Sequence, residues 1–275
     1  MQSVQAQTDA LIAAPAGRAL LFITARFGLD AAEIATPRKT LELAALALAE
    51  VSRWRIYRPA ALSQLERADL HRLQSQARAL LASPGAAWWF APLERSRQVW
   101  LSHDGDPPLA ERLVSPAGLP SSWERYAQKP ANGFFTSTLI DGSSGAATAL
   151  TVGTSDFSET FQPGPIACWR LDAAPDSRVF EIDGPGPWHD LCGRYPARGE
   201  DGRIVPDWSA VASDFDAVHL TLGGLLTTEQ VRIDSPSGWS QHDGWDFEQT
   251  LWLHWKFTRA ERLPDVHVEA KAIAR

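Results

Sequence analysis

A single carboxylate stands directly ahead of the most regularly patterned strand in the chain. The segment GWDFEQTLWLHWKF (244–257) places Glu248, with Asp246 two residues before it, at the start of an alternating run. Leucine and aromatic residues fall on one side, and Trp252, His254 and Lys256 fall on the other, which predicts a half-buried β-strand over 249–257. An acid at the mouth of such a strand either caps the turn or points at a ligand.

Two further predicted strands carry side chains that could meet this acid. QVWLS (98–102) is preceded by Arg97 and followed by His103. GFFTSTLI (133–140) presents two aromatic rings and then three hydroxyl groups in succession: Phe134, Phe135, Thr136, Ser137 and Thr138. The three segments together form the constellation in this chain that could perform chemistry.

This order of motifs resembles that of the ADP-ribosyltransferase superfamily. A histidine or arginine beside a first strand, an aromatic residue followed by Ser/Thr on a second, and a glutamate opening a late strand are shared features, and the resemblance covers about residues 88–258. It implies an enzyme with a split mixed β-sheet that uses NAD as substrate and transfers ADP-ribose to an acceptor. The acceptor could be a protein, a nucleic acid or a small molecule.

The resemblance assigns the central role to Glu248. Breaking the bond between nicotinamide and ribose develops positive charge on the sugar, as in glycoside cleavage, and a fixed carboxylate stabilises that charge more than the neutral ground state. The same glutamate would bond a ribose hydroxyl. The hydroxyls of Thr136, Ser137 or Thr138 would hold the ribose and orient the acid, with Ser137 as the catalytic member.

The remaining site residues are also assigned by resemblance. Phe134 or Phe135 would stack on the nicotinamide ring. His103 would bond the ribose or the carboxamide, and Arg97 would replace it in an arginine-led site, where a guanidinium pairs with pyrophosphate. Asp246 stands where members that modify arginine or bases place Glu or Gln, so the target type stays open.

Other functions remain possible from the same residues. Glu248 could be a rim acid paired with an arginine, and the hydroxyls could be ordinary strand formers. A non-enzymatic protein could use a tryptophan-rich surface, since the chain has 12 Trp, to bind a protein or carbohydrate. An RNA 2′-phosphotransferase on a related fold would need basic residues such as Arg194, Arg198 and Arg203.

Common phosphate, dinucleotide and zinc motifs are absent from the sequence, and we expect no metal site. His189 and Cys192 have a spacing that a metal could use, but two ligands do not make a site. The segment DFDAVHLTLGGLLTTEQV (214–231) predicts a strand, turn and helix of the core. A role for His219 beside the substrate is the weaker alternative.

The elements that must position these residues divide at about residue 85. Before it, apolar residues recur at helical spacing, and Thr36 with Pro37, Asp30 with Glu33, and Ser63 with Glu66 mark helix starts. After it, short strands alternate with Gly- and Pro-rich loops. We expect an α+β protein with a helical bundle over 1–85 and an α+β catalytic domain over 86–275.

Composition sets the broad class. A chain of 275 residues with 44% hydrophobic and 21% charged residues can bury a sizeable core. Its net charge of −7 gives no overall attraction for nucleic acid or an anionic membrane. Cys168 and Cys192 alone favour free buried thiols in a reducing compartment. No run is long enough to cross a bilayer, so we expect no membrane partner and a cytoplasmic protein.

Overall fold

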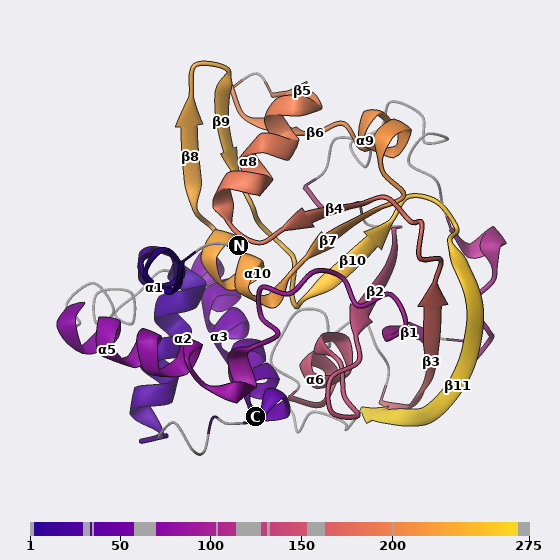
Figure 1. Ribbon diagram of the computed structural model, residues 1–275, viewed down its shortest axis with the longest axis horizontal. Coiled ribbons are helices and arrows are strands. Elements are labelled where there is room, and N and C mark those ends of the chain that lie inside the picture. Colours follow the sequence, from indigo (N-terminus) through magenta and orange to yellow (C-terminus); the bar gives the residue numbers. More distant parts are fainter. Residues whose placement is uncertain are drawn as a thin grey trace.

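The computed structural model combines a group of helices with a mixed β-sheet, which confirms the α+β class (Figure 1). It describes residues 3–29, 34, 36–57, 70–102, 104–113, 128–130, 133–152, 163–199 and 201–268. The N-terminal elements are α1 (Val4–Ala13), α2 (Pro15–Arg26), α3 (Pro37–Tyr57), α5 (Leu70–Leu81) and the 3₁₀ turn η1 (Pro84–Ala86).

Helix starts and stops follow local sequence signals in this part. The Thr36 hydroxyl accepts a hydrogen bond from the Lys39 N–H at 3.3 Å, so the predicted cap of α3 is confirmed. Gly28, just past α2, takes a positive φ of 63°, which glycine adopts without strain. The predicted capping boxes Asp30–Glu33 and Ser63–Glu66 lie outside the described residues.

Seven strands form the main sheet in the order β11-β3-β1-β2-β10-β7-β4. The strands are β1 (Gln98–Ser102), β2 (Phe134–Thr138), β3 (Gly164–Ala173), β4 (Val179–Ile182), β7 (Ala217–Leu220), β10 (Gln249–Trp252) and β11 (Phe257–Val268). Neighbours are antiparallel except β4 and β7, which run parallel, so the sheet is mixed.

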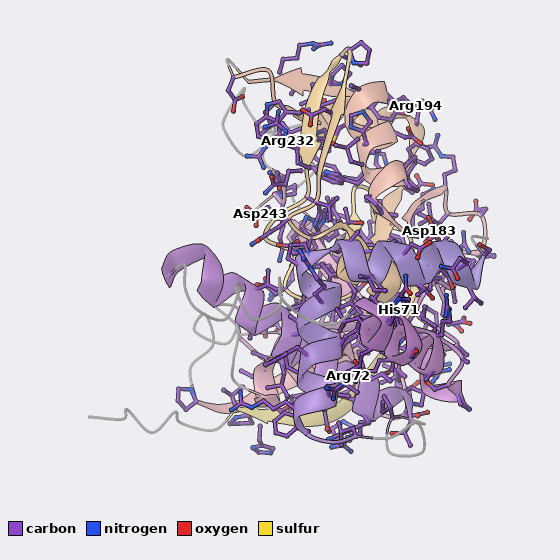
Figure 2. The ribbon with its side chains drawn as sticks, turned by 90° about the vertical axis from the view of Figure 1, so that its left-hand side faces the viewer. His71, Arg72, Asp183, Arg194, Arg232 and Asp243 are labelled. Atoms are coloured by element: carbon purple, nitrogen blue, oxygen red, sulfur yellow. The ribbon has the colours of Figure 1, made fainter. Side chains whose placement is uncertain are left out.

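A smaller group of elements projects from one edge of the sheet, at the top of Figure 1. It contains α8 (Pro185–Arg194), α9 (Trp208–Asp214) and two hairpins, β5 (Pro196–Arg198) with β6 (Ile204–Pro206) and β8 (Arg232–Ser235) with β9 (Gly238–Gln241). Figure 2 labels Arg194 and Arg232, which belong to this projecting group of elements. The remaining elements are η2 (Ala110–Arg112), α6 (Gly145–Val152) and α10 (Leu222–Thr228).

The two faces of the main sheet differ in chemistry because side chains alternate along each strand. One face carries Val99, Val218 and Leu251, which pack in cores shared with the helices. The opposite face carries an aromatic cluster at one end, including Phe134 and Trp252. On that same face, polar side chains occupy consecutive strands in the middle of the sheet.

The helical segment before residue 85 shares one hydrophobic core with the rest of the chain. Leu20 and Leu48 from these helices belong to the same buried cluster as Leu220 and Leu225. Trp89 fixes the junction, because its indole N–H donates to the Thr40 hydroxyl at 3.3 Å and its carbonyl accepts from the Gly223 N–H at 2.7 Å. The change in sequence pattern near residue 85 therefore does not coincide with a gap in packing between the helices and the rest of the chain.

The predicted strand over 249–257 is wrong in extent. β10 ends at Trp252, and the N–H groups of Leu253 and His254 donate to the Asp216 carbonyl. The chain then crosses to β11, which begins at Phe257 and pairs with β3 at the far edge of the sheet. The apolar alternation of the sequence continues beyond the end of β10 because Leu253, in this crossing, is fully buried.

Most other predicted elements are confirmed within a few residues. β1 has the expected bounds, and Asp207 caps α9 through its carboxylate, which accepts from the N–H groups of Ser209 and Ala210. Both cysteines are free and buried, and burial raises the pKa of the Cys168 thiol to about 11. In the part of the chain that is described, no single helix is long and apolar enough to cross a membrane, although the bent pair α1 and α2 passes that test together.

Candidate functional site

Glu248 is held at the point where β2 and β10 stop pairing. The register that pairs Thr136 with Thr250 would place Thr138 opposite Glu248, but β10 begins one residue later, at Gln249. The Thr138 N–H donates to Oε2 of Glu248 at 2.9 Å, and the Thr138 hydroxyl donates to Oε1 at 2.8 Å. The carboxylate is 1% exposed. Both donors come from one residue, which fixes the carboxyl plane.

His219 lies on the other side of the same carboxylate. Its Nε2 is 3.1 Å from Oε1 of Glu248, and its Nδ1 is 2.6 Å from Oε2 of Glu181. The imidazole is buried, and burial lowers its pKa, but the hydrogen bonds to Glu181 and Glu248 outweigh that effect and raise the pKa to about 9. At neutral pH the ring is therefore protonated and donates to both acids.

A chain of hydrogen bonds runs across the sheet toward Glu248. The Trp252 indole N–H can only donate, so the Thr136 hydroxyl accepts this hydrogen bond at 2.8 Å. The same hydroxyl donates to Oε1 of Gln98 at 2.6 Å. The Gln98 amide donates to the Thr138 hydroxyl at 3.3 Å, and that hydroxyl donates to Glu248. Along this chain each residue donates to the next one nearer Glu248, so the carboxylate at its end acts as a hydrogen-bond acceptor.

A cavity of about 170 Å³ opens beside Glu248. Its wall includes Thr138, His219 and Glu248 from the sheet, Thr221 and Leu222 at the start of α10, and Trp88, Ala91, Pro92, Glu94 and Arg97 from the segment that crosses the polar face. Pockets for drug-sized ligands are roughly 300–1,000 Å³. The cavity can therefore enclose one ring-sized end of a larger ligand, with the remainder outside.

The indole N–H of Trp88 has no hydrogen-bond partner among the described residues, but its nitrogen is closed to solvent, so it does not face the open space of the cavity. One feature of the cavity wall suits a ligand. Arg97 is exposed just before β1, where a cation can meet an anionic group at the rim.

The sequence-predicted hydroxyl residues divide between the two faces of β2. Thr138 contacts Glu248 directly, and Thr136 supports it through Gln98. Ser137 faces the other way, and its hydroxyl accepts from the Ala146 N–H in the first turn of α6 at 3.3 Å. The expected convergence of Ser137 with Glu248 is not observed, because neighbouring residues on a strand point to opposite faces.

The predicted aromatic residues do not reach the cavity. Phe134 stacks on Trp100 with ring centroids 5.4 Å apart and is 3% exposed, so it is a core residue. Phe135 lies on the opposite face, edge-on to Trp245 at 5.9 Å. Trp88 is the ring that lines the cavity.

The other predicted site residues have separate placements. Arg97 lines the cavity, as the arginine-led alternative requires. His103 lies outside the described residues. Asp246 forms an ion pair with Lys129 at 3.0 Å and is not part of the cavity wall.

Two side chains of this hydrogen-bond network, Gln98 and Glu181, were not predicted from the sequence, and His219 was only a weaker alternative. Glu181 and His219 are polar residues between apolar neighbours in a strand, and that is the signal that could have identified them. Gln98 begins β1 directly after Arg97 and carries no such signal. What the sequence does not contain is the strand order, which places β1, β2, β10, β7 and β4 side by side.

A second buried pair lies away from the cavity. Nδ1 of His242 is 2.8 Å from Oε2 of Glu229, and the Gly244 N–H donates to Oε1 of Glu229 at 3.0 Å. Burial raises the pKa of Glu229 well above its ordinary value and lowers that of His242 to about 3, so the His242 ring is neutral at pH 7. Neither residue lines the cavity beside Glu248, and the pair's contacts within the protein indicate a structural role.

No metal-binding group of three His, Cys, Asp or Glu side chains occurs in the described ranges. Nδ1 of His189 lies 2.8 Å from the Ser240 hydroxyl, and Cys192 on the same helix is fully buried. His189 is therefore part of the contact between α8 and β9.

Comparisons of the chain with family models, curated proteins and solved structures give no match. The chemistry of the cavity is therefore inferred from its own residues.

Proposed function

We propose that this chain is an NAD-dependent ADP-ribosyltransferase with Glu248 as its catalytic carboxylate. The observation that carries the proposal is a fully buried acid, fixed from two sides by donors, at the wall of a ring-sized cavity with an arginine at its rim. The separation of β2 from β10 at Thr138 and Glu248 supports the split-sheet arrangement that the sequence resemblance implies.

In the proposed reaction the bond between C1′ of the ribose and the nicotinamide nitrogen breaks. The bonding electron pair leaves with nicotinamide, which becomes neutral, and C1′ becomes cationic. A nucleophile on the acceptor, or water, then bonds to C1′ and releases a proton. Glu248 stabilises the cationic sugar because its negative charge is fixed before the reaction and does not have to reorient.

The cavity wall supplies the remaining roles. Trp88 stacks on the nicotinamide ring and replaces Phe134 and Phe135 in that role, since both of those rings pack elsewhere. Arg97 pairs with the pyrophosphate, which extends out of a cavity too small for the whole dinucleotide. The acceptor approaches from the solvent side of the ribose.

The RNA 2′-phosphotransferase alternative has less support. Arg194 pairs with Asp214 at 3.0 Å. Arg198 and Arg203 line a separate cavity of about 680 Å³ that also contains Asp201 and Asp207 and shares no residue with the one beside Glu248. These arginines therefore do not converge with the proposed catalytic acid.

The alternative of a tryptophan-rich binding surface also has less support. Five tryptophans are almost completely buried: Trp89, Trp188, Trp208, Trp245 and Trp252. Trp239 is covered by guanidinium groups of Arg203 and Arg232, at 5.2 and 4.4 Å from its ring. Most rings described in the structure are therefore engaged within the protein.

Labelled NAD tests the proposal. The protein is incubated with NAD that carries the label in its adenylate part, with and without a cell lysate, and the label is followed into protein, nucleic acid and small-molecule fractions. Transfer into any fraction, accompanied by release of nicotinamide, supports the proposal and identifies the acceptor class. Intact NAD after prolonged incubation in both samples would reject it.

A further inference from the structure

Glu248 has a second set of contacts that the proposed reaction does not by itself require. A carboxylate offers about four acceptor positions, two on each oxygen. Oε1 receives the Thr138 hydroxyl and His219 Nε2, while the closest bond to Oε2 is the Thr138 N–H at 2.9 Å. Among the described residues, one position on Oε2 therefore has no donor and is left for a ligand.

His219 is fixed in turn by Glu181. Their atoms are 2.6 Å apart, and the other oxygen of Glu181 accepts from the Leu93 N–H at 3.0 Å. Leu93 belongs to the segment 88–97, which forms one wall of the cavity. Glu181 thus connects the cavity wall to the imidazole, and the imidazole connects to the catalytic acid.

We infer that Glu181 and His219 form a positioning pair, which fixes the carboxylate of Glu248 so that Oε2 accepts a ribose hydroxyl. This inference rests on the proposed function. Neither member touches the reacting atoms: His219 acts through Glu248, and Glu181 acts through His219. The arrangement joins β4, β7 and the residue preceding β10, three neighbours in the sheet.

The pair works only while His219 carries two protons. A neutral ring that keeps its proton on Nδ1, toward Glu181, presents the lone pair of Nε2 to Oε1 of Glu248, and two acceptors repel each other. The charged groups that face this ring are Glu181 from β4 and Glu248 before β10, and Glu94 and Arg97 line the same cavity from the segment before β1. Deprotonation of His219 therefore removes one of the hydrogen bonds that orient Glu248 and leaves those from Thr138.

This behaviour predicts an alkaline limit to activity. The pKa of His219 is raised to about 9, so turnover is expected to hold through neutral pH and to fall as pH passes that value. Glu181→Gln removes one of the two acids that raise the pKa of His219 but leaves the ring buried. The pKa of His219, and with it the pH at which turnover declines, is therefore expected to fall by at least about one unit. For a shift of one unit, turnover at pH 7.5 falls less than about twofold and turnover at pH 9 falls roughly fivefold relative to wild type, while KM for NAD changes less than about threefold, because the loss is in orientation and not in binding.

The experiment compares wild type, Glu181→Gln and a matched control, Glu111→Gln, whose side chain is exposed in η2. Rates of nicotinamide release are measured from pH 6 to 10. In parallel, proteins with ¹⁵N-labelled histidine are examined by NMR, with His219→Gln to assign the signals. We expect both nitrogens of His219 to be protonated at pH 7.5, and its pKa to fall in Glu181→Gln but not in Glu111→Gln.

The outcomes separate this inference from the proposed function. If NAD is cleaved and Glu181→Gln keeps the wild-type pH profile, the positioning pair is rejected while the function stands. If wild type does not cleave NAD, the function is rejected and the NMR measurement decides the pair. A His219 with one unprotonated nitrogen at pH 7.5, or with a pKa unchanged by Glu181→Gln, would overturn it in either case.

Discussion

Thr138 donates two hydrogen bonds to Glu248, one from its backbone at 2.9 Å and one from its hydroxyl at 2.8 Å. If the β2–β10 register continued, the backbone of Glu248 would pair with the backbone of Thr138. Instead, the Thr138 N–H donates to the side-chain carboxylate of Glu248, and the pairing of β2 with β10 ends where the cavity begins. The same two residues therefore end a pair of strands and build the site.

Thr138→Val removes the hydroxyl and keeps the backbone donor and the branched shape. A hydrogen bond to a charged group contributes about 1.5–3 kcal/mol, so we expect nicotinamide release to fall roughly 10- to 100-fold. Thr138→Ser keeps the hydroxyl and should retain most of the activity. Equal rates for the valine and serine variants, with both folded by circular dichroism, would show that the hydroxyl does not orient Glu248.

Stability should fall at alkaline pH through His219. Its folded pKa of about 9 lies above the ordinary value of 6.5, so its stabilising contribution is complete below about pH 6.5 and is lost as pH rises through 9. At about 1.4 kcal/mol per pKa unit, the loss is roughly 3 kcal/mol. Urea unfolding of wild type and His219→Gln between pH 6 and 10 measures it. Parallel curves for the two proteins would contradict the prediction.

Glu229→Gln should stabilise the protein at neutral and alkaline pH. The folded pKa of Glu229 is raised well above 4.5 by burial, so wild type loses stability as pH rises above that value, whereas the amide stays neutral. Gln can accept from Gly244 and donate to Nδ1 of His242. The free energy of unfolding of the variant should exceed that of wild type at pH 8 and approach it near pH 5. A less stable variant at pH 8 would mean that the carboxylate is required.

Two glycines on helices provide a matched test of packing. A Cβ on Gly224 in α10 would lie 2.1 Å from the Ile182 carbonyl oxygen, whereas one on Gly186 in α8 meets nothing within 4 Å. Gly224→Ala should therefore cost roughly 1–3 kcal/mol, and Gly186→Ala should be neutral or slightly stabilising. Thermal unfolding of both variants measures this. A Gly224→Ala protein as stable as wild type would show that β4 and α10 are not in close contact.

Local signals in the sequence predicted the elements well. Thr36 with Pro37 and the short strand QVWLS (98–102) depend on neighbours a few residues apart, which the sequence contains directly. The end of β10 was missed because Leu253 remains buried in the crossing to β11. Apolar alternation reports burial, and burial does not stop where a strand does.

The site could be predicted only in part. Glu248, Thr138 and Arg97 were predicted as site residues and line one cavity, and an acid at a strand mouth and an arginine before a strand are visible in the sequence. Ser137 and Phe135 depend on which face of β2 is turned to the cavity, and a shift of one residue reverses that face. Phe134 shares the face of Thr138 but lies at the other end of the strand, in the aromatic cluster. His219 and Glu181 come from strands whose positions in the sheet are set by tertiary packing.

The central claim is that the negative charge of Glu248 stabilises a cationic sugar, and Glu248→Gln tests it most directly. Nicotinamide release from NAD is measured for wild type, Glu248→Gln and the exposed control Glu111→Gln, with unfolding curves to show that each is folded. Removal of a preorganised electrostatic group costs about 100-fold or more in turnover. We therefore expect release by wild type and by the control, and a loss of at least that size in Glu248→Gln. Turnover by folded Glu248→Gln equal to wild type would contradict the claim.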